Sequence, residues 1–237
     1  MQRWVNKLAK AKTPKTIQNA HGLLSAVLSE YKPSMVLRTT LPQKVKHEVQ
    51  IPSESDIAAI SASCAGTKYE LPIMLAIWLG LRESEILGLT WDCIDGDYIN
   101  IKQAIVMSEH GPVEKGTKTY SGNRRIRLPA YLKNLIEKQP RKGSHIVNMS
   151  AKAVYSGFVR TCEKAGIQQH YRFHDLRHMN ASVMLASGVP DKYSMKRMGH
   201  ATNNMLKNVY QHTIKEKEIQ YDDVIDSYFE KLIKPCE

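Results

Sequence analysis

The chain of 237 residues is 42% hydrophobic, which allows one full-sized core and a small second unit but excludes two large domains. Its formal net charge of +11 is regional: residues 1–50 carry nine Lys or Arg against two acidic residues, residues 51–100 two against eight, and residues 114–142 nine against two. Such basic surfaces attract nucleic acids, and also anionic membranes or other polyanions, so charge alone does not identify the partner.

Other classes of protein are disfavoured by what the sequence lacks. Its apolar runs are shorter than the roughly 20 residues that span a bilayer, and residues 1–12 lack the apolar region of a signal peptide. The four cysteines are irregularly spaced and form no CxxC pair of the kind that marks zinc or redox sites. We therefore expect a soluble, cytoplasmic protein with reduced thiols and no membrane partner.

The N-terminal part predicts a helix followed by a connecting segment. Thr13 and Pro14 suit the N-cap and the first turn, and apolar residues then recur at helical spacing, which predicts a helix from about 14 to 31. Residues 32–52 contain three prolines and no periodicity, as in a linker. We place the domain boundary there, with residues 1–45 before it and the main domain over residues 46–237.

The first part of the main domain predicts two helices and a small sheet. Ser53 and Asp56 form a capping box that opens a helix, and a second helix runs through residues 71–79 to Gly80. Alternation over residues 98–106 predicts a strand, and residues 124–129 predict another, with the Gly-containing segment between them as a loop.

Beyond residue 130 the pattern becomes helical again. Helices are predicted over residues 150–166, 174–188, 190–199, about 203–210 and about 214–233. The expected fold is therefore mainly α with a small antiparallel β-sheet, an α+β class.

Several side chains suit phosphate chemistry. A phosphodiester carries its charge on two non-bridging oxygens, so attack without a metal requires fixed cationic donors and a nucleophile. Arg82 lies just past Gly80 at a predicted helix junction, which suits a rigid guanidinium, although taken alone a surface pairing with Glu83 or Glu85 is the favoured interpretation. His174 and Arg177 are three residues apart and point the same way on a helix, where both can bind one anion.

A third segment follows in residues 196–212. Gly199 ends a predicted helix, His200 lies at the turn, and Tyr210 comes ten residues later. An ordinary phenol has a pKa of about 10, so Tyr210 needs neighbouring cations that favour the phenolate before it attacks at neutral pH. Most single tyrosines of this kind belong to a core, and each of these patterns is weak in isolation.

Taken together, the patterns resemble a known family. GLRESEILGLTW at 80–91, the lysine-containing KGTKTYSGNRRIRLP at 115–129, HDLRH at 174–178, MGH at 198–200 and the downstream tyrosine follow the order seen in tyrosine recombinases, the phage integrase family. The resemblance covers roughly residues 50–215 and implies a catalytic domain like that of these enzymes. Its six catalytic residues match Arg82, Lys118, His174, Arg177, His200 and Tyr210, with Lys115 as an alternative hairpin lysine.

The resemblance also implies an activity and partners. It implies a site-specific DNA strand transferase that forms a 3′-phosphotyrosyl intermediate without metal or cofactor, for integration or excision of a prophage or other mobile element. The implied partners are double-stranded DNA, three further copies in a tetramer on paired sites, and a directionality factor, with a monomer expected without DNA and a location on the nucleoid. Residues 1–45 would be the C-terminal remnant of a helical core-binding domain plus linker, so we expect a truncated N-terminus and weakened DNA binding.

Two alternatives remain at this stage. Residues 181–199 are similar to a helix-turn-helix with Gly188 at the turn, which would suit a non-catalytic DNA-binding regulator. A type IB topoisomerase would share the tyrosine chemistry but relax supercoils without joining specific sites. Glu85 and Asp175 are candidates for orienting an arginine or histidine, although capping and solvation explain them equally well.

Overall fold

The structure, a computed structural model, describes residues 1–43, 50–116 and 122–199. The chain divides into two compact units, Met1–Glu48 and Val49–Glu237. The helices predicted near 203–210 and 214–233 lie outside the described residues. Within the described ranges, none of the helices is both long and apolar enough to cross a membrane.

The first unit contains two helices, α1 (Gln2–Ala9) and α2 (Pro14–Tyr31). The Thr13 hydroxyl accepts a hydrogen bond from the Thr16 backbone at the start of α2, and Pro14 occupies its first turn, so the helix predicted over 14–31 is confirmed. Gln2 exchanges two hydrogen bonds with the backbone of Thr40, of 2.9 and 3.1 Å, which attaches the segment after α2 to α1.

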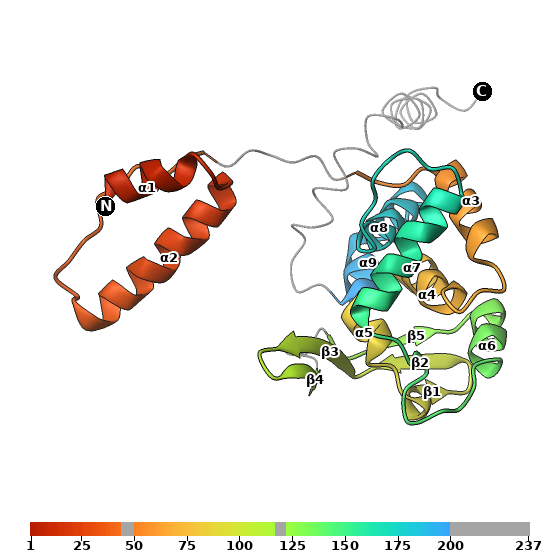
Figure 1. Ribbon diagram of the computed structural model, residues 1–237. Coiled ribbons are helices and arrows are strands. Elements are labelled where there is room, and N and C mark those ends of the chain that lie inside the picture. The colour runs from red at the N-terminus through yellow and green to blue at the C-terminus, as the bar shows by residue number, and fades with distance from the viewer. Residues whose placement is uncertain (44–49, 117–121, 200–237) are drawn as a thin grey trace, which may run out of the picture. The chain divides into compact units, whose positions relative to one another are not determined.

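The second unit is mainly helical with antiparallel β-structure, as the sequence predicts, but the strands form two small sheets instead of one (Figure 1). Its described elements are α3 (Glu54–Cys64), α4 (Glu70–Leu79), α5 (Glu83–Leu87), a 3-10 turn (Trp91–Cys93), β1 (Ile94–Asp95), β2 (Tyr98–Ile101), β3 (Gln103–Ser108), β4 (Gly111–Gly116), β5 (Arg124–Arg127), α6 (Ala130–Glu137), α7 (Ala151–Lys164), α8 (Asp175–Ala186) and α9 (Asp191–Met198).

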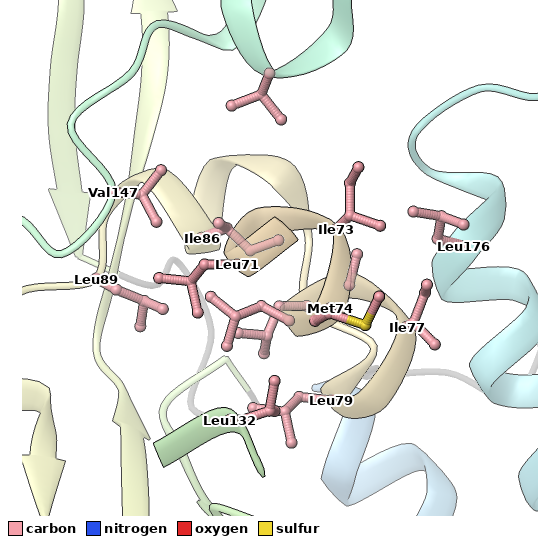
Figure 2. Close-up of a cluster of buried hydrophobic side chains, with 14 of the residues drawn as sticks. Leu71, Ile73, Met74, Ile77, Leu79, Ile86, Leu89, Leu132, Val147 and Leu176 are labelled. Atoms are coloured by element: carbon pink, nitrogen blue, oxygen red, sulfur yellow. The ribbon is translucent and has the colours of Figure 1, made fainter. Parts of the chain in front are cut away.

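The core of this unit surrounds α4. The sequence ELPIMLAIWL is apolar on nearly every face, which is typical of a fully buried helix, and its residues pack with side chains from α5, α6 and α8 (Figure 2). The helix ends at Gly80, whose φ of 62° is left-handed, as predicted. Ser53 and Asp56 form the predicted capping box at the start of α3.

The β-structure differs from the prediction at two points. Residues 98–106 form two strands in separate sheets: β2 pairs with β1 and β5, whereas β3 pairs with β4. The segment between the predicted strands is not simply a loop, because Gly111–Gly116 forms β4. Its Pro112 and two glycines resemble loop composition, and the strand forms through pairing with β3, in an edge position that tolerates proline.

Gly157 allows α7 to pack closely against Tyr69. A Cβ added at this glycine would lie 2.3 Å from two atoms of the Tyr69 ring, closer than any real contact. The Tyr69 hydroxyl also accepts a hydrogen bond of 2.8 Å from Arg160 of α7, which keeps the ring beside the same helix.

We therefore predict that Gly157→Ala lowers the free energy of unfolding by about 1–3 kcal/mol through overpacking, although alanine favours an isolated helix by about 1 kcal/mol. Urea denaturation measures the change. In a Tyr69→Ala background the same substitution should become stabilising, and a stabilising effect in the wild-type background would contradict the contact.

Candidate active site

Arg82 lies at the junction between α4 and α5. Gly80 gives the left-handed turn, and a Cβ there would meet the Asn180 side chain of α8 at 2.7 Å. The Glu85 carboxylate accepts a hydrogen bond of 2.9 Å from the Arg82 backbone N–H, which fixes the start of α5. Its other oxygen accepts from Arg82 Nη1 at 2.7 Å, so backbone and guanidinium are bound by one carboxylate.

Three arginines meet at Glu85, whose side chain is only 3% exposed. Arg124 of β5 forms a bidentate pair with it, at 2.9 Å to Oε1 and 2.8 Å to Oε2. Arg177 of α8 has Nη1 3.8 Å from Oε2. We call these four residues, Glu85, Arg82, Arg124 and Arg177, the Glu85 cluster. It brings together side chains that are up to 95 positions apart in the sequence.

The cluster carries a net positive charge. Burial alone would raise the pKa of Glu85, but hydrogen bonding and charge from Arg124, the Arg82 backbone N–H and the charge of Arg177 outweigh it and lower the pKa to about 2. Glu85 is therefore ionised at neutral pH. Three guanidinium groups against one carboxylate leave two positive charges in the cluster.

Arg177 is fully buried and connects the ends of two helices. Its Nη1 donates to the Gly80 carbonyl at the end of α4, and its Nη2 donates to the Met198 carbonyl at the end of α9. Burial, and next the charge of Arg82, lower the pKa of Arg177 to about 9, while Glu85 acts in the opposite direction. Arg177 stays charged at pH 7, and contact with a phosphate requires a local rearrangement that exposes it.

His174 immediately precedes α8, one turn before Arg177. Its ring makes an edge-to-face contact with that of His178, with centroids 5.0 Å apart. Partial burial, followed by the charges of His178 and Arg177, lowers the pKa of His174 to about 4, and Arg82 acts in the same direction. The neutral imidazole is therefore favoured at pH 7.

The structure thus brings three predicted residues, Arg82, Arg177 and His174, into one region. Lys118, His200 and Tyr210 lie outside the described residues, and the alternative Lys115 is exposed on β4. Two described residues next to these segments, Gly122 and Gly199, contact the Glu85 cluster. Arg82 Nη2 donates to the Gly199 carbonyl at 3.3 Å, one residue before His200, and Arg124 Nη1 donates to the Gly122 carbonyl at 3.2 Å.

The sequence interpretation missed Arg124 and left the roles of two acids open. Alternation along β5 could have identified Arg124, because it shares the buried face with Ile126 while Arg125 and Arg127 are exposed. Glu85 orients the Arg82 guanidinium, as one interpretation proposed, and also caps the start of α5, as the other proposed. Asp175 instead binds Arg172, accepting from its backbone at 2.8 Å and its guanidinium at 3.0 Å.

In the described part of the chain, no group of three or more His, Cys, Asp or Glu side chains could hold a metal ion.

The lowered pKa of Glu85 predicts a pH-dependent stability. Because its folded-state pKa of about 2 lies below the ordinary 4.5, its stabilisation is complete above pH 4.5 and is lost as the pH falls toward 2. Glu85→Gln should therefore be less stable than the wild type by about 3 kcal/mol at pH 7, and the difference should shrink as the pH falls to 3. Urea denaturation across this range measures it; a constant difference would contradict the prediction.

Comparison with known proteins places these observations in a family. Residues 52–217 match the phage integrase family. A XerC-like tyrosine recombinase of Caldanaerobacter subterraneus subsp. tengcongensis is 26% identical over an alignment that covers 97% of this chain and 70% of that protein.

Solved structures show the same fold. The Tn1549 transposon integrase, residues 82–397 in complex with circular intermediate DNA, superimposes with a TM-score of 0.74 at 19% identity, over 88% of this chain and 79% of that one. A lambda integrase dimer (residues 75–356) bound to a core site gives 0.65 at 17% identity, over 87% and 77%. The chain therefore belongs to the phage integrase family, the tyrosine recombinases, which are enzymes that cleave and rejoin DNA strands.

Proposed function

We propose that this recombinase cuts DNA with Tyr210 as the nucleophile. The phenolic oxygen attacks the scissile phosphorus, the bond to the 5′ oxygen breaks, and a 3′-phosphotyrosyl link forms while a 5′ hydroxyl departs. A 5′ hydroxyl from a second duplex then attacks the phosphotyrosyl bond, which rejoins the strands and releases Tyr210. Two such exchanges recombine two sites without an external energy source.

The observation that carries this proposal is the Glu85 cluster, where Arg82 and Arg177 approach one buried carboxylate and retain net positive charge. Negative charge grows on the non-bridging oxygens as the phosphorus is attacked, so fixed guanidinium groups stabilise the transition state more than the bound substrate. Arg82 is partly exposed at 36% of its side chain, so it is the arginine that a phosphate meets first.

The remaining residues move protons. Lys118 is proposed as the acid toward the leaving 5′ oxygen, with Lys115 as its alternative on β4. His174 and His200 are proposed to hydrogen-bond the phosphorane-like transition state and assist proton transfer. The lowered pKa of His174 supports a neutral imidazole, which can both donate and accept a hydrogen bond.

The substrate is proposed to be double-stranded DNA at a mobile element. The similar solved structures include a transposon integrase and lambda integrase, each bound to DNA, which supports this substrate class. We further propose a tetramer on paired sites, a monomer without DNA, a directionality factor and a location on the nucleoid. The first unit is proposed to be part of a core-binding domain, since residues 1–50 are strongly basic.

The two alternatives are less well supported. α8 and α9 do form a pair of helices around Gly188, and Lys192 and Lys196 are exposed, as a regulator would need. The inner face of α8, however, contributes Arg177 to a buried charge cluster, a feature that helix-turn-helix binding does not require. A topoisomerase would relax supercoils without preference for a site.

We predict that the wild type forms a covalent adduct with nicked duplex DNA, because a nick near the scissile phosphate lets the short fragment with the new 5′ hydroxyl diffuse away and prevents religation. Nicked genomic fragments of the source organism serve as substrate, denaturing gels detect the adduct, and sequencing of the attached DNA identifies the site. Tyr210→Phe should abolish the adduct, since phenylalanine lacks the attacking oxygen.

Tyr193→Phe is the matched control, because Tyr193 is 56% exposed on α9 and should not affect the adduct. An adduct that survives Tyr210→Phe would refute this nucleophile, and complete absence of adduct would favour the regulator. Relaxation of supercoiled DNA without a preferred attachment sequence would favour the topoisomerase.

A further inference from the structure

Arg124 is the member of the Glu85 cluster that has no place in the proposed mechanism. Its side chain is 2% exposed, and its donors are directed at protein acceptors. Nη1 and Nη2 bind the two oxygens of Glu85, Nη1 also donates to Gly122, and Nε donates to the Arg197 carbonyl at 2.8 Å. A guanidinium bound in this way does not contact DNA, so any effect on the reaction passes through its partners.

The principal partner is a carboxylate that lies beside both proposed phosphate-binding arginines. Glu85 is 2.7 Å from Arg82 and 3.8 Å from Arg177. If Arg124 were absent, this negative charge would offset one of the other two guanidinium groups. With Arg124 present, the cluster keeps two positive charges, which match a phosphodiester that passes from one negative charge toward two in a phosphorane-like transition state.

We propose that Arg124 is a positioning residue for strand cleavage: it binds both oxygens of Glu85 and compensates its charge, so that Arg82 and Arg177 keep theirs for the scissile phosphate. The inference rests on the proposed function of this site. The bond from Nε to the Arg197 carbonyl adds a second effect, because it fixes the last turn of α9, two residues before Gly199.

The neighbouring residue provides a matched control. Arg125 follows on the same strand but faces outward, where its side chain is 52% exposed, pairs with Asp95 at 2.8 Å and lies over the Tyr98 ring at 4.1 Å. Arg125→Gln and Arg124→Gln thus remove the same charge from adjacent positions, one outside the cluster and one inside it.

The test measures the rate of covalent adduct formation by the full chain at saturating concentrations of the DNA that the wild type traps. Arg124→Gln should lower this rate at least about 100-fold with DNA affinity changed less than about threefold, because the loss concerns the transition state. Arg125→Gln should stay within about twofold of the wild type.

Two variants restore the charge balance and should restore activity. Arg124→Lys keeps the positive charge, and Glu85→Gln combined with Arg124→Gln removes both charges. Each should therefore form the adduct at least about tenfold faster than Arg124→Gln. A substrate with a neutral methylphosphonate at the scissile position should reduce the defect of Arg124→Gln to less than about tenfold, because its transition state carries one negative charge fewer. A purely structural role would not predict this dependence on the substrate.

Thermal unfolding separates folding from chemistry. If Arg124→Gln does not fold, the two charge-balanced variants carry the test, and both must cleave within about tenfold of the wild type. The inference is overturned if these variants are as slow as Arg124→Gln, if they cleave more than about tenfold more slowly than the wild type while folded, or if Arg124→Gln behaves like Arg125→Gln. If the wild type forms no adduct, the proposed function is overturned as well. If the wild type is active and any of these outcomes is seen, only the positioning role of Arg124 is overturned.

Discussion

The arrangement of the second unit around its site depends on one interaction, the contact of the Glu85 carboxylate with three arginines. The carboxylate comes from α5, and its partners come from the start of α5, from β5 and from α8. Buried ion pairs contribute little net stability when they form, but loss of one partner leaves an uncompensated charge and is strongly destabilising. The cluster therefore specifies how these elements meet more than it stabilises them, and it assembles cationic groups in advance of any substrate.

Local signals were sufficient to predict most helices from the sequence. The start of α2 is determined by Thr13 and Pro14, the start of α3 by the Ser53–Asp56 capping box, and the end of α4 by Gly80. These residues satisfy backbone groups within a few positions of themselves, so their effect can be predicted locally. The prediction failed where pairing decides. β4 has the composition of a loop and becomes a strand only against β3. No helix was predicted at α6 (Ala130–Glu137) either, which follows a proline and has no side-chain cap.

The site was predictable in its parts but not in its connections. Spacing indicated that His174 and Arg177 share a helix face, and the junction at Gly80 indicated a fixed Arg82. No local pattern indicates that a carboxylate at position 85 binds an arginine 39 positions later, because that contact is made by tertiary packing. To predict such a long-range buried ion pair, one must know both that Arg124 is on the buried face of β5 and that α5 packs next to it. Neither fact alone indicates the contact.

The two arginines that are proposed to bind the phosphate also bind the backbone at the end of α9. Arg177 donates to Met198 and Arg82 to Gly199, immediately ahead of the segment that contains His200 and Tyr210. An oxyanion that takes these same N–H groups competes with the two carbonyls. Ligand occupancy and the conformation of the backbone at residues 198–199 are consequently linked, and by reciprocity whatever restrains that backbone alters the affinity for the anion.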